Sequence, residues 1–236
     1  MRTSHSLNVP AASHSNARLH EASGCYELQW KNTYRGAQNA CMSDYKTVRY
    51  RIDTNRSRFA VQAFVTGVLA AFAHSPVIAI RDFTGEAEFA PDALEKASLR
   101  LNVKAASLES VDDLSARERQ EIERITRDEV LEVFRYPEIT FESYEITGNN
   151  ITGGLHRVKI AGHLCLHGVK SKCAFDAQVS VTPDTLRANG EFMLRQSDYG
   201  IKPVNATAIF SISGGTIKLK DELKLSFDIV ARAYDA

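Results

Sequence analysis

Alternation of apolar and polar residues is the feature that most constrains the fold of this chain. Apolar residues occupy every second position from Ala97 to Ala105, and the same period of two recurs from Val158 to Leu166 and from Cys173 to Val181. Because neighbouring side chains of a strand point to opposite faces, this pattern predicts strands with one dry and one solvated face. The last two runs flank a turn signal near 168–171, so they are expected to form an antiparallel hairpin.

Further strands are expected along the rest of the chain, separated by turn signals rich in Gly, Asn, Asp and Pro. Their expected ranges are 59–63, 77–89, 97–105, 138–145, 155–166, 172–182, 187–194, 207–213 and 222–233. Apolar residues at helical spacing, preceded by the capping box Ser115-x-x-Glu118, predict a helix at about 115–134. Closure of so many strands removes exposed sheet edges. The predicted fold class is therefore mainly β, a single antiparallel β-barrel with one α-helical insertion.

Composition excludes several classes of partner. The chain carries 29 basic and 29 acidic residues, so neither a nucleic-acid-binding surface nor a polybasic membrane patch is expected. The longest apolar run, 64–73, is shorter than the roughly 20 residues that span a bilayer, and no transmembrane segment is expected. The first 25 residues lack the apolar core of a secretory signal. As written, the sequence predicts a cytoplasmic protein.

Catalytic and metal-binding motifs find little support in the sequence. It contains no Gly-x-Ser-x-Gly elbow, no P-loop and no Gly-x-Gly-x-x-Gly motif. His163, Cys165 and His167 share one face of a predicted strand, but three such positions span about 13 Å and cannot all bind one ion. Two of them with a third, unidentified ligand would be the basis of a metal-assisted enzyme, which stays an alternative. We predict no catalytic residues, no metal site, and free thiols at all four cysteines.

Three ordered motifs carry a family resemblance. They are Tyr-Pro-x-Ile-Thr-Phe-x-Ser at 136–143, Gly-x-Leu-x-Leu-His-Gly-Val at 162–169 and Asp-Tyr-Gly-Ile at 198–201. From about Tyr50 to Ala233 the chain resembles the polyisoprenoid-binding YceI-like family. The resemblance implies a lipocalin-like barrel over residues 47–236 that holds an isoprenoid lipid without catalysis and without any other cofactor. It also implies a homodimer and a role in envelope or stress physiology.

Residues 1–46 match nothing in the family pattern, and they are interpreted as a disordered or mis-assigned extension. Many members of the family are exported. If the chain starts elsewhere, for example near Met42, the expected location becomes periplasmic or secreted.

The dry faces of the strands are the candidate binding site, because an isoprenoid tail needs an apolar tunnel. The candidate lining residues are Phe59, Val61, Phe83, Gly85, Ala87, Phe89, Leu99, Leu101, Val103, Phe141, Val158, Ile160, Leu164, Leu166, Phe175, Phe192, Leu194 and Ile209. Gly85 and Ala87 would leave space between two phenylalanines. The same residues would also suit a solid core, since small barrels are usually filled with side chains. The alternative function is therefore a barrel packed shut, acting as a protein-interaction or stress-related structural module.

A tail in a tunnel leaves a head group at one mouth. The candidate residues for it are His74, Arg81, Arg195 and Tyr199, with Asp82 and Asp198 beside them. A pyrophosphate would favour arginine, whereas a quinone carbonyl would favour a neutral donor such as Tyr or His. The sequence leaves open whether the ligand is a quinone or a polyprenyl compound.

Overall fold

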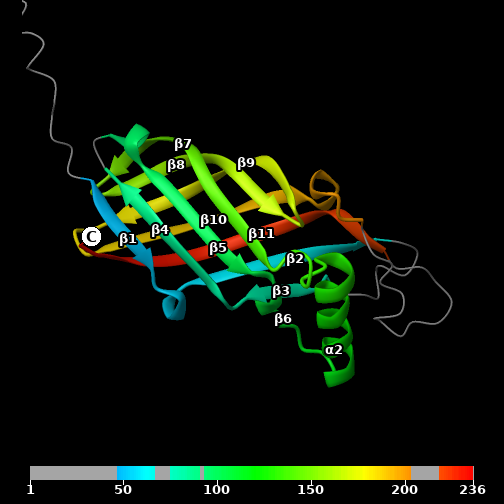
Figure 1. The fold of residues 1–236 in the computed structure, drawn as a ribbon. Coiled ribbons are helices and arrows are strands. Elements are labelled where there is room, and N and C mark those ends of the chain that lie inside the picture. Colours follow the sequence, from blue (N-terminus) through cyan, green and yellow to red (C-terminus); the bar gives the residue numbers. More distant parts are fainter. Residues whose placement is uncertain (1–46, 67–74, 91–92, 203–217, 236) are drawn as a thin grey trace, which may run out of the picture. The chain divides into compact units, whose positions relative to one another are not determined.

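The fold is an eight-stranded antiparallel barrel that closes on itself (Figure 1). A computed structural model describes residues 47–66, 75–90, 93–202 and 218–235. We call the eight antiparallel segments around the barrel wall its staves. Three staves each consist of two short strands with a bend between them. These pairs are β1 (Val48–Ile52) with β2 (Arg58–Thr66), β3 (Val77–Ile80) with β4 (Phe83–Phe89), and β5 (Ser98–Lys104) with β6 (Leu108–Ser110). The other five are β7 (Glu138–Thr152), β8 (Leu155–Leu166), β9 (Val169–Val181), β10 (Thr185–Arg195) and β11 (Lys218–Ala233). The predicted fold class is confirmed.

Each stave pairs with the next one in the chain, as in an up-and-down barrel. β11 closes the ring by pairing with β2 over most of its length and with β1 at its C-terminal end. The pairing of β9 with β10 is the exception to a continuous ladder: it covers only 178–181 of β9 and 186–189 of β10, so 169–177 and 190–195 are not paired with each other. The predicted strand 207–213 lies outside the described residues.

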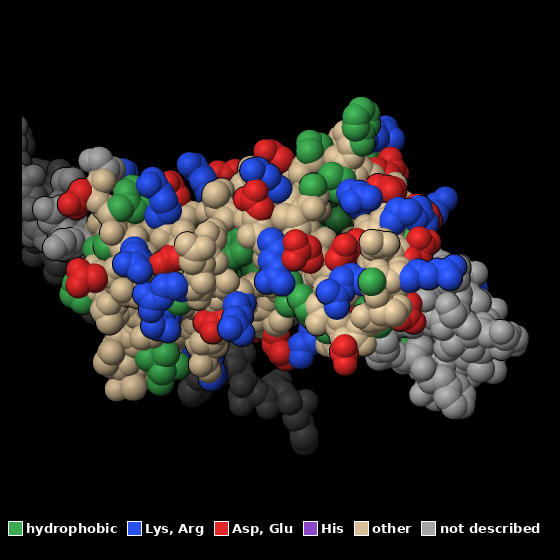
Figure 2. All heavy atoms as spheres, turned by 90° about the horizontal axis from the view of Figure 1, so that it is seen from below, with side chains coloured by type: hydrophobic (Ala, Val, Ile, Leu, Met, Phe, Trp, Pro, Cys, Tyr) green, Lys and Arg blue, Asp and Glu red, His purple; other side chains and the backbone are tan. Residues whose placement is uncertain are grey.

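Charged side chains cover the outside of the barrel and agree with its strand register. A row of opposed residues runs across four staves from Arg51 through Glu86 and Arg100 to Glu142. Ion pairs join Arg51 to Glu86 at 2.9 Å and Arg100 to Glu142 at 3.2 Å. Such exposed pairs contribute at most about 1 kcal/mol each. A slip of one residue would turn them into the interior, so the alternation fixes the register. Figure 2 shows basic and acidic side chains interspersed over one face.

The turn between β8 and β9 is tighter than the sequence suggested. It consists of His167 and Gly168 alone, with φ values of 51° and 73°. Two central residues with positive φ are what a two-residue type I′ hairpin requires. The strand predicted to begin at Lys172 therefore begins at Val169. His167 belongs to the turn and not to the strand face that carries His163 and Cys165, which corrects the predicted alignment of these three residues.

The helical insertion begins where its capping box predicts. α2 (Ala116–Ile125) continues as a π-helical turn, η5 (Thr126–Val130). The backbone N–H of Glu118 donates to Ser115 Oγ at 3.3 Å, and that of Ser115 donates to Glu118 Oε2 at 3.1 Å. The helix stops short of the predicted end at 134, since Glu132 adopts a left-handed φ of 45°. Among the described residues, no helix is long and apolar enough to cross a membrane.

Replacing Ser115 by Ala should lower the free energy of unfolding by about 1 kcal/mol, because a helix N–H loses its acceptor. Urea unfolding would measure the change. Ser180 is exposed on β9, so Ser180→Ala serves as a control with little expected effect. An equal loss in both variants would contradict a capping role for Ser115.

Part of the barrel interior is tightly packed around Tyr50. Tyr50, Phe89 and Val158 belong to one cluster of buried side chains. Tyr50 is 1% exposed, and its hydroxyl donates to the carbonyl of Thr182 at 3.1 Å. The fully buried His156 ring packs edge-on against Phe89, with centroids 5.2 Å apart. Tyr50, Phe89 and Val158 do not line the cavity described below, whereas Leu186 and Ala231 of the same cluster do.

Candidate functional site: the barrel cavity

The barrel contains a cavity of about 190 Å³. It runs along the interior from Ile52, Ala87 and Ala231 to the helical insertion and the segment that follows β10. Its walls are overwhelmingly apolar, and they include Val130 and Leu131 from the helical insertion and Ile201 from the segment after β10. Inward-facing residues of the staves supply the rest of the lining.

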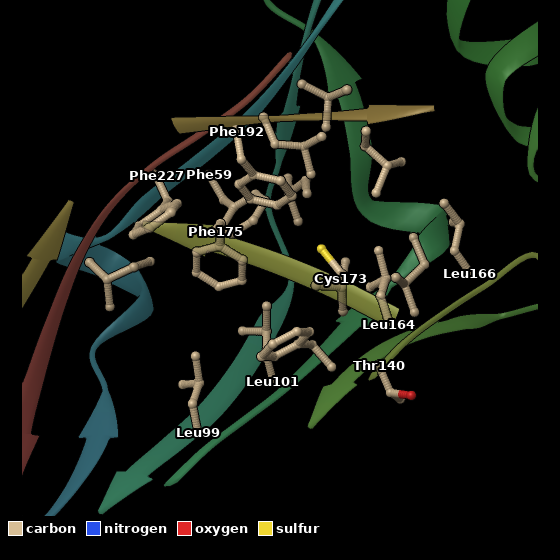
Figure 3. Close-up of a pocket in the computed structure, with 18 of the residues that line it drawn as sticks. Phe59, Leu99, Leu101, Thr140, Leu164, Leu166, Cys173, Phe175, Phe192 and Phe227 are labelled. Carbon is tan, nitrogen blue, oxygen red and sulfur yellow. The ribbon is translucent and has the colours of Figure 1, made fainter. Parts of the chain in front are cut away.

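A cluster of phenyl rings fills the centre of the barrel beside the cavity (Figure 3). Phe175 of β9 stacks on Phe192 with centroids 4.7 Å apart, and it meets the edge of Phe227 at 5.7 Å. Phe227 stacks in turn on Phe59 at 6.0 Å, and Phe141 lies 5.5 Å from Phe175. Rings at these separations interact favourably beyond their burial. The cluster therefore gives the cavity a firm aromatic wall.

Glycines make room for these rings. A Cβ at Gly162 would lie 2.4 Å from Phe141 Cζ, and one at Gly190 would lie 2.7 Å from Phe227 Cζ. Gly85 behaves differently from the prediction, because a Cβ there would lie 2.6 Å from Ile52 Cδ1. Gly85 allows close packing of Ile52 and does not open space for a ligand. A bulky replacement at Gly85 would consequently disturb packing and would not test binding.

Most of the residues predicted to line the site do face the cavity. These are Phe59, Val61, Ala87, Leu99, Leu101, Val103, Phe141, Ile160, Leu164, Leu166, Phe175, Phe192 and Leu194. Phe83, Phe89 and Val158 are buried in neighbouring core clusters. With Gly85, they lie outside the lining. Ile209 lies outside the described residues. That the lining residues bind a lipid stays a prediction.

Sequence reasoning missed one whole wall of the cavity. Alternate residues of β11 line it, namely Leu223, Leu225, Phe227, Ile229 and Ala231. Their spacing of two in the sequence is enough to place them on one face of a strand. The sequence analysis predicts a strand at 222–233 and assigns none of its residues to the lining. Val130 and Leu131 were harder to find, since a helical insertion gives no indication of which residues enter a barrel.

Polar groups reach the cavity at few points. The lining includes Thr140, Cys173 and Gln196, and no Lys, Arg, Asp, Glu or His side chain among the described residues. The Thr140 hydroxyl points away from the phenyl cluster, whereas the Cys173 sulfur lies among the lining side chains (Figure 3). Gln196 is 2% exposed, and its Nε2 donates to the backbone carbonyl of Lys220 at 2.8 Å. The cavity is therefore uncharged, with an amide and a thiol as its polar groups.

Burial alters the acidity of two groups near this end. Desolvation raises the pKa of the Cys173 thiol to about 11, so the thiol is neutral at physiological pH. Burial likewise raises the pKa of Tyr199 to about 12, and a hydrogen bond with Ser171 opposes the rise. Both groups remain protonated, and neither adds charge to the cavity.

The head-group candidates lie away from the cavity lining. Arg81 pairs with Glu109 at 3.0 Å, and Arg195 pairs with Asp198 at 3.1 Å, all on the exposed surface. Tyr199 is 2% exposed and packs in the core cluster that includes Leu166, Leu194 and Ile201. His74 lies outside the described residues. The sequence predicts an arginine near the head group, but Arg195 lies outside the cavity. Its neighbour Gln196 lines the cavity instead.

The histidines and cysteines of β8 and its turn do not converge. His163 packs against the ring of Tyr144 at 5.1 Å, and His167 Nε2 lies 3.2 Å from Glu132 Oε1. Cys165 and Cys173 are both free thiols. Within the described part of the chain, no group of three or more His, Cys, Asp or Glu residues could hold a metal ion.

Comparisons with known proteins agree with this architecture. The YceI-like domain model matches residues 50–231. BcnA of Burkholderia cenocepacia has a similar structure, with a TM-score of 0.58 and 16% identity over 76% of this chain and 98% of that one. A polyisoprenoid binding domain from Saccharophagus degradans, implicated in plant cell wall breakdown, gives a TM-score of 0.57 at 13% identity over 79% and 99% of the two chains. Among curated proteins, no match to the chain was found.

Proposed function

Because the chain belongs to the YceI-like domain family, we propose that it binds an isoprenoid-chain lipid inside its barrel and stores or carries it without chemical turnover. The observation that carries this proposal is the apolar cavity inside the barrel. Its walls suit a hydrocarbon chain, which needs burial and little directional bonding. The Saccharophagus degradans structure, a polyisoprenoid binding domain of the same fold, supports the same ligand class.

Hydrophobic burial provides the affinity in this proposal. Each methylene removed from water contributes about 0.8 kcal/mol, so even a short isoprenoid segment gains several kcal/mol. The volume of about 190 Å³ exceeds that of an apolar cavity able to hold benzene, about 150 Å³.

The alternative of a barrel packed shut is less consistent with the interior. That description fits the cluster of Tyr50, Phe89 and Val158, which does not line the cavity. A purely structural barrel would be expected to fill its whole interior in the same way, since close packing stabilises a core. The retained space favours a ligand.

A binding role without catalysis is supported by the chemistry of the lining. The Cys173 thiol, with its pKa raised to about 11, is a poor nucleophile at neutral pH. The Gln196 amide is neither an acid nor a base. We infer that the protein holds its ligand and leaves it unchanged.

Native mass spectrometry of protein purified without detergent, followed by organic extraction, tests the proposal. We expect a prenyl lipid at near-stoichiometric yield, because an apolar cavity retains its ligand during purification. An empty protein that also takes up neither added quinones nor polyprenyl compounds would overturn the lipid-binding function.

A further inference from the structure

One seam of the barrel wall lacks a continuous backbone ladder, and it lies beside the cavity. β9 and β10 pair with each other only between 178–181 and 186–189. Extending this register places 172–175 of β9 opposite 192–195 of β10, where the two strands are not paired. We propose that the isoprenoid enters and leaves the cavity sideways through this seam, and that the rings of Phe175 and Phe192 control its passage. The inference rests on the proposed function and assigns the route of its ligand.

Each strand of the seam is held from its other side. β8 pairs with β9 throughout 169–180, and β11 pairs with β10 throughout 185–195. Opening a continuous ladder leaves backbone N–H and C=O groups without partners, which is unfavourable. Among the described residues, no such bonds join 172–175 to 192–195. The two strands can therefore separate there while the rest of the barrel stays intact.

The seam opens directly onto the cavity. Cys173 and Phe175 from β9, and Phe192 and Leu194 from β10, all line it. The rings of Phe175 and Phe192 stack across the seam, with centroids 4.7 Å apart and an interplanar angle of 16° (Figure 3). A side-chain contact thus takes the place of backbone bonds at this point of the wall. Side chains change rotamer far faster than hydrogen-bonded structure opens locally, so the two rings are suited to act as a gate.

Close contacts bound the seam at both ends. At the ladder end, a Cβ at Gly190 would lie 2.6 Å from the backbone oxygen of Asp176, so the strands touch there. At the other end, Tyr199 of η6 (Gln196–Tyr199) shares a hydrogen bond with Ser171 of β9. Between these contacts the seam runs for about 13 Å, since an extended strand rises about 3.3 Å per residue. This length exceeds the width of a hydrocarbon chain.

Like charges face each other across the seam on the outer surface. In the extended register, Asp176 lies opposite Glu191, and Lys172 lies opposite Arg195. The two β10 residues form their ion pairs away from β9, Glu191 with Lys224 at 2.7 Å and Arg195 with Asp198 at 3.1 Å. Like charges directly opposite each other disfavour strand pairing. The sequence itself therefore opposes closure of the seam by a ladder.

The outer surface between these charged pairs is apolar. Met193 is 56% exposed, and the extended register places it opposite Ala174, which is exposed as well. A thioether is flexible and adapts to different hydrocarbon shapes. An isoprenoid that approaches from outside thus meets apolar atoms before it reaches the two rings.

Entry and release rates of a fluorescent farnesol analogue, measured by stopped flow with the full-length protein, test this route. Phe192→Ala removes one of the stacked rings and should raise both rates by about two- to tenfold, as loss of one aromatic contact would allow. A residue that acts only through contacts with bound ligand would change the release rate and leave the entry rate. Phe134→Ala is the matched control, because the fully exposed Phe134 lies outside the cavity lining and both rates should stay within about twofold.

A charge reversal tests the seam in the opposite direction. Lys172→Glu replaces repulsion of Arg195 by attraction, which should hold the strands together and slow entry and release by about two- to fivefold. Lys170→Glu makes the same change of charge two positions earlier, beyond the seam, and should change both rates by less than about twofold. Neither lysine lines the cavity, so equilibrium affinity should stay nearly constant in both variants.

The competing entrance is the end of the cavity at the helical insertion, where Leu131 lines it. An entry rate raised by Leu131→Ala and unchanged by Phe192→Ala would overturn the seam and place the entrance at the insertion. Equal rates in Lys172→Glu and Lys170→Glu would also contradict passage through the seam.

Thermal unfolding shows whether each variant folds. If Phe192→Ala does not fold, Phe192→Leu keeps an apolar side chain in place and still removes the stacked ring, so the same rise in both rates is expected. Absence of equilibrium binding by the original protein would contradict the proposed function itself. Normal binding with rates that are insensitive to Phe192 and Lys172 would contradict the route alone.

Discussion

Replacing Ala188 by Phe should lower the affinity for an isoprenoid lipid by about a hundredfold or more. Ala188 lies on β10 and lines the cavity directly. A phenyl ring is about the size of benzene, which occupies an apolar cavity of about 150 Å³. It would therefore fill most of the 190 Å³ that is present. The loss should appear as a raised dissociation constant in titration with a fluorescent isoprenoid.

Ala174→Phe provides the matched control for this change. Ala174 is exposed on the outer face of β9, between the inward-facing Cys173 and Phe175. The same substitution there adds an aromatic ring without entering the barrel, so binding should stay within about twofold. Overpacking costs about 1–3 kcal/mol, and thermal unfolding of both variants shows whether Ala188→Phe still folds. A folded Ala188→Phe protein that binds lipid normally would exclude the cavity as the site.

Much of the barrel could be predicted because each strand has one solvent-exposed face and one buried face, which gives alternating polar and apolar residues in the sequence. The alternation from Ala97 to Ala105 identified Leu99, Leu101 and Val103 as interior residues, and all three line the cavity. Period two is a direct consequence of the pleat, so it survives without knowledge of the partner strand. The capping box at Ser115 is equally local, which is why the helix start was correct.

Features that depend on distant contacts were harder to predict. Gly85 looked like space for a ligand, yet Ile52 of the neighbouring stave occupies that space. The space left in the interior also depends on which side chains meet across the barrel. His156 and Phe89 are 67 positions apart in the sequence and pack edge to face. Alternation assigns a face to each residue, and it cannot assign the volume that remains.

The position of Gln196 illustrates the same limit. Tyr199 belongs to the motif Asp-Tyr-Gly-Ile at 198–201, and Arg195 carries a charge near it, so both are natural candidates for a head group. Gln196 stands between them without a pattern of its own. The end of β10 turns Leu194 and Gln196 inward and Arg195 outward. Strand parity, extended by one residue beyond the strand, decides which polar side chain lines the cavity.

Replacing Phe175 by Ala should lower the free energy of unfolding by about 3 kcal/mol, at the lower end for loss of a core phenyl group because this ring borders a cavity. For a chain of this size the loss corresponds to a fall in melting temperature of roughly 6–12 °C. Phe175 is the centre of the ring cluster, in contact with Phe192, Phe227 and Phe141. Phe134→Ala is the control, because Phe134 is fully exposed and its loss should change stability by less than about 0.5 kcal/mol.

The same variant should gain more stability from a bound lipid than the original protein does. The Phe175 ring lines the cavity, so its removal enlarges the cavity. A branched isoprenoid tail can then restore part of the van der Waals contact that the ring made with its neighbours. A ligand at a hundred times its dissociation constant stabilises a folded protein by about 2.7 kcal/mol, and at a fixed ligand concentration a lower dissociation constant raises the stabilisation. Thermal unfolding with and without farnesol measures the difference. A lipid-induced shift smaller in Phe175→Ala than in the original protein would show that the tail does not reach the ring cluster.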